Sequence, residues 1–180
     1  MRAIEGSFQA LAERVIANPC VEIAPENDSA ASRFFALWRS RAVYRYRPDG
    51  LVPLNSVKAD ALSKSQEELL ESRWTGYVRP GGVPARQMYG LSIQRDIDAL
   101  TKALCERRWG VLALIEGELI VPDMPDRYFI PLTPTLCLAW GHETGRISGA
   151  DAGLLNQAFM AGCEVYWFCR TLPGYGLETR

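Results

Sequence analysis

Apolar residues near the start of the chain repeat at the spacing of an amphipathic helix. One helical face carries four of them: Ile4, Phe8, Leu11 and Val15. The pattern stops at Asn18 and Pro19, because proline inside a helix lacks a backbone donor and clashes with the preceding turn. This periodicity predicts a first amphipathic helix that ends at Asn18.

Two further helices are predicted before residue 77. The polar run 27–29 offers an N-cap for the second, and the Pro-Asp-Gly run 48–50 ends it. Its apolar side consists of Phe34, Phe35, Trp38 and Ala42. Ser65 and Glu68 have the spacing of a capping box, which predicts a third and shorter helix. Residues 1–76 are therefore expected to be helical.

Residues 77–90 concentrate glycine and proline, which is typical of an exposed connector. Ser92 is placed to cap the helix that follows. The apolar positions of that helix are Ile93, Ile97, Leu100 and Leu104. We expect this helix to dock on a sheet.

The remainder of the chain has the shorter apolar runs of β-strands. Residues 109–115 are rich in β-forming side chains, and the Glu-Gly pair 116–117 suits a tight turn, so residues 118–121 are predicted to complete a hairpin. Further strands are predicted over 128–132, 136–140 and 164–169. Ser148 and Asp151 have capping-box spacing for a helix that lies before the last of these strands.

The pattern as a whole predicts one α+β domain, in which a helical N-terminal half packs with a mainly antiparallel sheet in the C-terminal half. Its parts are a helical part (1–76), the connector (77–90), a helix and sheet part (91–170) and a loose tail (171–180). A chain of 180 residues buries a sizeable core without disulfide or metal support. With 48% hydrophobic and 23% charged residues, its composition is that of a folded globular protein.

Composition also bears on location and partners. No run approaches the roughly 18 apolar residues of a membrane span, and the first residues do not resemble a secretory signal. We therefore expect a cytoplasmic protein without a membrane partner. The 5 cysteines contain no Cys-x-x-Cys pair, which favours reduced thiols over a disulfide framework or a zinc site.

Four features of the chain together carry a family resemblance. The segment 33–41, RFFALWRSR, is similar to a helix that ends in arginine, and Asp123 with Pro125 resembles a Ser-Asp-Asn-Pro turn. The Pro-Leu-Thr-Pro run 131–134 and Asn156 follow at matching positions. These features resemble an uncharacterised bacterial family whose full-length members begin with a His-His-Tyr-Val-Pro motif.

This chain departs from that family in two places. The double-histidine opening is absent, and Met124 stands where the family has an asparagine. No function is established for the family. If its histidines are catalytic, the resemblance implies that this chain is a truncated or repurposed relative.

Acidic residues cluster around the predicted hairpin: Glu116, Glu118, Asp123 and Asp126. Carboxylates at strand ends can hold Mg²⁺ for phosphodiester cleavage, so one hypothesis is a metal-dependent nuclease or related hydrolase that uses these four residues. A restriction-type nuclease would also carry a Glu-x-Lys on a following strand, but all 3 lysines precede the hairpin. Acids beside turns usually face water, and Asp123 can bond its own turn backbone. We therefore interpret them first as structural, with no metal or cofactor.

Other common catalytic patterns are missing. His142 lies in the polar segment 141–147, which is predicted to be an exposed loop. No serine or cysteine lies in a nucleophile elbow, and no glycine-rich phosphate loop is present. Catalysis is therefore not the first expectation for this chain.

The segment 33–47 combines aromatic residues with five arginines and contains no acid. The arginines are Arg33, Arg39, Arg41, Arg45 and Arg47. We interpret the segment first as an amphipathic core helix, whose arginines are candidates to bind an acidic protein surface. The net charge of −1 argues against general nucleic-acid affinity.

These observations favour a non-catalytic protein-interaction module, because aromatic residues and arginine are enriched at interfaces. Its expected partner is a protein within a larger complex. One such role is that of an inhibitor, encoded by a phage or mobile element, which binds a bacterial defence complex. The magnesium-dependent hydrolase remains the alternative.

Overall fold

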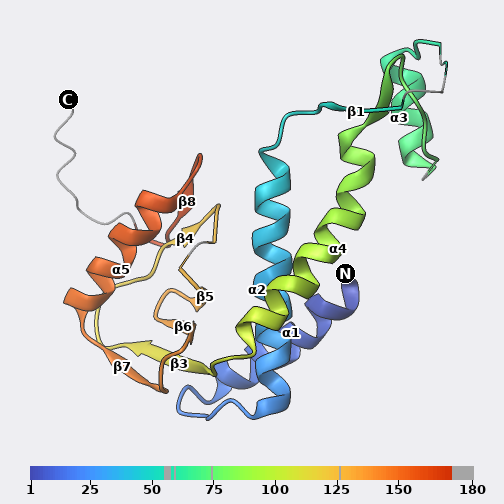
Figure 1. Ribbon diagram of the computed structural model, residues 1–180. Coiled ribbons are helices and arrows are strands. Elements are labelled where there is room, and N and C mark those ends of the chain that lie inside the picture. The colour runs from blue at the N-terminus through green and yellow to red at the C-terminus, as the bar shows by residue number, and fades with distance from the viewer. Residues whose placement is uncertain (55–57, 59, 74, 126, 172–180) are drawn as a thin grey trace, which may run out of the picture.

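The computed structural model describes residues 1–54, 58, 60–73, 75–125 and 127–171 (Figure 1). The helices are α1 (Arg2–Ala17), α2 (Pro25–Arg45), α3 (Lys64–Ser72), α4 (Ala85–Leu104) and α5 (Gly149–Gly162). The strands are β1 (Leu51–Pro53), β2 (Gly82–Pro84), β3 (Trp109–Leu114), β4 (Val121–Pro122), β5 (Phe129–Thr133), β6 (Leu136–Trp140), β7 (Gly145–Ile147) and β8 (Trp167–Phe168).

The predicted α+β class is confirmed. The main sheet has the strand order β5-β6-β3-β7, in which β5, β6 and β3 are antiparallel and β7 joins β3 in parallel. Two further antiparallel pairs, β1 with β2 and β4 with β8, lie outside this sheet. The helical half and the sheet half thus follow one another along the chain, as the sequence predicts.

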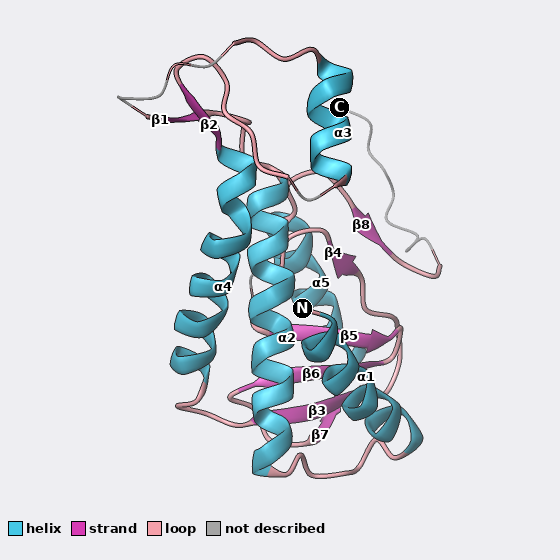
Figure 2. Ribbon diagram, turned by 90° about the vertical axis from the view of Figure 1, so that its right-hand side faces the viewer, coloured by secondary structure: helices cyan, strands magenta, loops and turns pink. Residues whose placement is uncertain are grey.

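Helices cover both faces of the main sheet. Figure 2 shows α1 and α2 in front of the sheet with α4 beside α2, and α5 lies behind the sheet. Because successive strand residues point to opposite faces, Val111 and Leu138 pack toward α1 and α2, whereas Leu112 and Cys137 pack toward α5. The sheet is therefore buried between two helical layers.

Two helices match their sequence predictions closely. In α1, the buried residues are the four of the predicted apolar face. In α5, the Ser148 side chain accepts from the Asp151 amide, and the Asp151 side chain accepts from the Ser148 amide, so the predicted capping box is confirmed. Local sequence signals suffice here because each helix has one apolar side and a clear stop or start.

The predicted hairpin is wrong. Gly117 does make the turn, with φ at 82°, but residues 118–121 do not return along β3. Both edges of β3 are already occupied, by β6 and β7. Leu119 and Ile120 are buried against α5 instead, and the Ile120 amide donates to Asn156 Oδ1 at 3.0 Å.

The predicted connector 77–90 is corrected by the structure. It contains β2, and α4 begins at Ala85 rather than at Ser92. Gly82 is needed for close pairing, because a Cβ atom there would lie 2.1 Å from the Val52 carbonyl oxygen. Pro84 is the N-cap residue of α4. Gly82 therefore allows strand β2 to pair with β1, and Pro84 lies at the start of helix α4.

Smaller differences concern element ends. Helix α2 starts at Pro25, since proline is tolerated in the first helical turn. The capping box of α3 uses Ser63 and Gln66, two residues earlier than the predicted Ser65 and Glu68. The predicted loop 141–147 contains β7, and the predicted strand 164–169 is reduced to β8. The tail beyond Thr171 lies outside the described residues.

One part of the chain stands apart from the main body. Strands β1 and β2 and helix α3 lie at the far ends of α2 and α4, away from the main sheet (Figure 1). We call β1, α3, β2 and the described residues between them the apical lobe.

Replacing Phe35 by alanine is expected to destabilise the protein by about 3–5 kcal/mol, because the deletion leaves a cavity in the core. The Phe35 side chain is 0% exposed and lies 5.9 Å, centroid to centroid, from the Trp109 ring. Urea unfolding followed by circular dichroism measures the loss. Ile16→Ala, on the exposed side of α1, serves as the control and should change stability by no more than about 0.5 kcal/mol. Equal losses in the two variants would contradict this account of the core.

Candidate functional site

A groove of about 380 Å³ lies between α2 and the β4–β8 strand pair. Its volume falls within the range of roughly 300–1,000 Å³ that is typical of ligand sites. On the α2 side it is lined by Phe34, Trp38, Arg41, Ala42 and Arg45. The rest of the lining is Phe8, Val121, Pro122, Asp123, Ile130, Pro131, Tyr166 and Phe168. We call this feature the α2 groove.

The far side of the α2 groove is attached to α2 by polar contacts near the end of that helix. Tyr46 donates its hydroxyl to Asp123 Oδ2 at 2.7 Å, and Arg45 donates to the Tyr166 hydroxyl at 2.7 Å. Arg39 donates to the Pro125 carbonyl at 3.0 Å. These contacts set the distance between α2 and the strand pair, and with it the width of the groove.

Asp123 is the acid of the predicted cluster that is bonded mainly by backbone amides. Besides Tyr46, the backbone amides of Glu164, Val165 and Tyr166 donate to its carboxylate at 3.1, 2.9 and 3.3 Å. Partial burial acts to raise the pKa of Asp123, but the hydrogen bonds from Tyr46 and the three amides outweigh it and hold the pKa below the usual carboxyl value. The same contact raises the pKa of Tyr46 to about 12.

The other predicted acids lie in separate environments. Glu118 accepts from Arg170 at 2.6 Å and from the Thr171 amide at 3.1 Å, and the Arg170 guanidinium is the main reason that the pKa of Glu118 is lowered. Glu116 is exposed beside Gly149. Asp126 lies outside the described residues. Glu118 and Asp123 thus hold the two ends of the segment 164–171.

The described residues contain no group of three or more His, Cys, Asp or Glu side chains that could hold a metal ion. The hydrolase hypothesis needed Asp123 together with Glu116, Glu118 or Asp126 around one ion. Among the described members of that set, Asp123 and Glu118 are each engaged with their own donors. Asp123 and Glu118 therefore take part in separate contacts.

The five arginines predicted to bind a partner are spread around α2. Arg41 and Arg45 line the groove. Arg39 contacts the Pro125 carbonyl, and the Arg47 guanidinium lies 4.4 Å from the centroid of the Tyr44 ring. Arg33 is exposed and lines a separate depression between α1 and α2. The structure thus brings two of the five to one surface.

The arginines of the groove differ in their partners. Arg41 pairs with Glu5 at 2.6 Å, in a contact where both side chains are largely exposed. Arg45 donates to Tyr166, and its guanidinium lies 5.6 Å from the centroid of that ring. Within the described part of the chain, no carboxylate pairs with Arg45.

Sequence reasoning missed the aromatic residues on the far side of the groove, Tyr166 and Phe168. Phe168 is 62% exposed, which is unusual for a large aromatic side chain. The alternation of residues 164–169 predicts a strand, but its partner, β4, is only two residues long and carries no local signal. His142 is exposed, as predicted, and its ring lies 5.5 Å from the centroid of Phe129.

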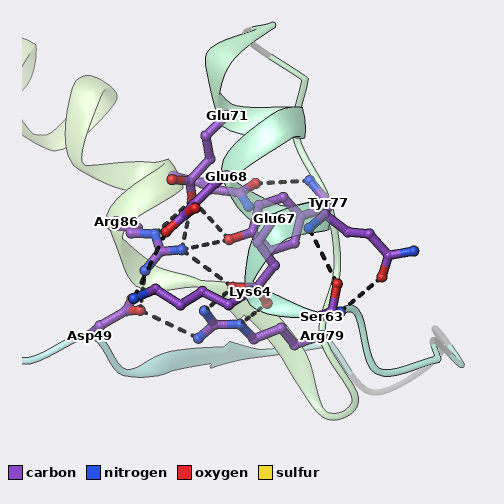
Figure 3. Close-up of polar contacts among 11 residues, drawn as sticks. Asp49, Ser63, Lys64, Glu67, Glu68, Glu71, Tyr77, Arg79 and Arg86 are labelled. Atoms are coloured by element: carbon purple, nitrogen blue, oxygen red, sulfur yellow. Dashed lines mark hydrogen bonds and ion pairs between the residues drawn. The ribbon is translucent and has the colours of Figure 1, made fainter.

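A second polar site holds the apical lobe together (Figure 3). Arg79 donates two hydrogen bonds to Glu67, at 2.7 and 2.6 Å, and a third to Asp49 at 3.3 Å. Arg86 pairs with Asp49 and Glu71, at 2.7 Å in each case. We call these five residues the apical ion-pair cluster.

Helix α3 is attached through this cluster rather than through apolar packing. Its buried residue is Glu67, at 8% exposure, whereas Leu69 is 50% exposed. The Arg79 guanidinium lowers the pKa of Glu67. Tyr77 completes the contacts by donating to Glu71 at 2.8 Å and accepting from Arg86 at 2.6 Å. The lobe therefore depends on charge pairing.

Comparison of the chain with protein-family models, with curated proteins and with solved structures found no match. The resemblance to the His-His-Tyr-Val-Pro family consequently stays a prediction. Among the described residues, no helix combines the length and the apolar character that crossing a bilayer requires.

Asp123→Asn is expected to cost about 1–3 kcal/mol at pH 7, because hydrogen bonds to a charged acceptor are replaced by weaker ones. The pKa of Asp123 is lower in the folded protein than in the unfolded chain. The ionised carboxylate therefore contributes its full stabilisation above the unfolded carboxyl pKa of about 4, and this stabilisation is lost as the pH falls through the folded pKa. Urea unfolding at pH 7, 5 and 3.5 should show that the difference in unfolding free energy between wild type and Asp123→Asn becomes smaller as the pH falls. Glu164→Gln removes one charge from an exposed neighbour and is the control. A gap that is the same at every pH would contradict the assignment.

Arg79→Met is expected to loosen the apical lobe without unfolding the main body, because Glu67 loses its bidentate partner. Hydrogen exchange measured by mass spectrometry should be roughly tenfold faster in α3 and unchanged in β3 and β6. Arg73→Met, at the exposed end of α3, is the matched control. Unaltered exchange in α3 of the Arg79 variant would show that other contacts hold the helix.

Proposed function

We propose that the protein is a non-catalytic interaction module that binds a protein partner through the α2 groove. The observation that supports this most directly is the composition of the groove. Its lining combines Phe34, Trp38, Tyr166, Phe168 and two arginines, and aromatic residues and arginine dominate the energetic centres of protein interfaces.

The contacts that hold the two sides of the groove also favour binding. Its α2 side belongs to a helix whose opposite side is buried, with Phe35 and Leu37 in the core. Its far side is attached to α2 through Tyr46, Arg45 and Arg39. A surface that is ordered before binding loses less conformational entropy when a partner docks.

The biological role that fits this proposal is inhibition by occupancy, in which a small protein covers a functional surface of a larger assembly. A bacterial defence complex remains the proposed target. The hydrolase alternative gains no support from a specific contact, because Asp123 already accepts from Tyr46 and three backbone amides.

The proposal is tested by comparing two variants of neighbouring exposed residues. Phe168 lines the groove, whereas Val165, which is 69% exposed, is not among its lining residues. Tagged wild type, Phe168→Ala and Val165→Ala are used to capture partners from bacterial lysate after nuclease treatment. A truncated interface hot spot costs more than about 1 kcal/mol, so Phe168→Ala should recover the partner at least about fivefold less well. Val165→Ala should match the wild type.

Thermal unfolding of the three proteins checks that both variants are folded. A partner that survives nuclease treatment and is lost only with Phe168→Ala supports the proposal. Equal recovery by Phe168→Ala and wild type would mean that the groove is not the docking surface.

A further inference from the structure

Arg45 has hydrogen-bonding capacity that the described residues do not use. A guanidinium carries five N–H donors, and the contact recorded for Arg45 is one hydrogen bond to the Tyr166 hydroxyl. The aromatic rings of Tyr46 and Tyr166 lie 5.7 and 5.6 Å from its guanidinium carbon. These rings orient the group without neutralising its charge.

Asp123 does not supply the missing anion. It is the acid among the described lining residues of the groove, and its carboxylate accepts from Tyr46 and from the amides of residues 164–166. Arg45 donates to the Tyr166 hydroxyl rather than to Asp123. The groove therefore presents an arginine that pairs with no carboxylate of the described residues, beside an apolar surface.

Arg41 offers a second position for an anion. Its pair with Glu5 is largely exposed, and exposed ion pairs are worth only about 0–1 kcal/mol, so a competing carboxylate can replace Glu5 at small cost. Arg41 and Arg45 are four residues apart on α2, which places them about 6 Å apart along the helix axis. Two acidic side chains at a similar spacing match this pair.

We propose that the α2 groove takes a short acidic segment of a protein, with an aromatic or aliphatic side chain packed against Trp38 and Phe168 and a carboxylate bound to Arg45. A second carboxylate, about 6 Å further along, replaces Glu5 on Arg41. This inference rests on the proposed function and specifies the chemistry of the partner at the same surface.

A nucleic acid fits the groove less well than an acidic peptide. Affinity for phosphates grows with the number of basic contacts, and the described lining of the groove contains two arginines. The chain as a whole carries a net charge of −1. An apolar lining beside a charged group suits a protein segment that has both kinds of side chain.

The test uses random linear peptides displayed on phage and selected against the full chain, with Phe168→Ala as the counter-selection protein. The selected peptides should be enriched in Asp or Glu next to an aromatic or aliphatic residue. For the tightest synthetic peptide, fluorescence anisotropy should show that Arg45→Gln weakens binding roughly tenfold or more. Arg33→Gln removes the same charge from α2 outside the groove and should change the Kd less than about twofold.

A second set of peptides isolates the charge contact. Each acidic residue of the selected peptide is replaced in turn by its amide. At one position the change should weaken binding to wild type by a similar factor and make little difference to Arg45→Gln. This non-additivity would tie the peptide carboxylate to Arg45.

Other outcomes separate this inference from the proposed function. Peptides that require Phe168 but show no acidic preference would overturn the acidic-segment inference and leave the groove as the docking surface. Failure to select any peptide that requires Phe168 would overturn the inference, while the partner-capture comparison still decides the function. Tight, Arg45-dependent binding of a single-stranded RNA or DNA oligonucleotide would overturn it in favour of a nucleic-acid ligand.

Discussion

Helix α2 is buried on more than one side, and the rest of the structure depends on that constraint. Three consecutive residues, Phe35, Ala36 and Leu37, are at most 1% exposed, although they point in three directions around the helix. Phe35 packs with α1 and the main sheet, whereas Ala36 and Leu37 pack with Ile97 of α4. A helix enclosed in this way has only a narrow strip left for solvent. On its C-terminal half, that strip carries Arg41 and Arg45 and forms one side of the groove.

Polar contacts with charged side chains help to hold the parts that are attached around this apolar centre. The β4–β8 strand pair is tied to α2 through Asp123 and Tyr46, and the apical lobe is tied to α4 through Arg86 and its carboxylate partners. Hydrogen bonds to charged groups are strong when one partner is shielded from water, but they weaken when the acid is protonated. The main body should therefore stay folded at a lower pH than either attachment. The shape of the groove depends on the ionisation of Asp123, although Asp123 is not proposed to contact a partner.

Much of the fold could be predicted because it is encoded locally. The apolar face of α1, the capping box at Ser148 and strands β3, β5 and β6 follow from periodicity and turn residues within each segment. The path of the chain after Gly117 could not be predicted in this way. The glycine specifies a turn, but it does not specify which strands lie beside β3. The residues of the groove also differ in whether a local sequence signal predicts them. Arg41 and Arg45 could be recognised as candidates from α2 alone, whereas Tyr166 and Phe168 join them through a two-residue pairing with no local signature.

Asp123 illustrates why residue type alone misleads about chemistry. An aspartate near a strand end suggests a metal ligand or a general base, yet here the carboxylate accepts from a phenol and three backbone amides. Those bonds hold its pKa low, which makes it a weak base, and a metal ion would have to displace donors that also position Tyr166. Because Asp123 is committed in this way, the polar group with spare capacity in the described lining of the groove is the Arg45 guanidinium. The structural use of Asp123 and the spare donors of Arg45 both support the proposal that the groove binds an anion.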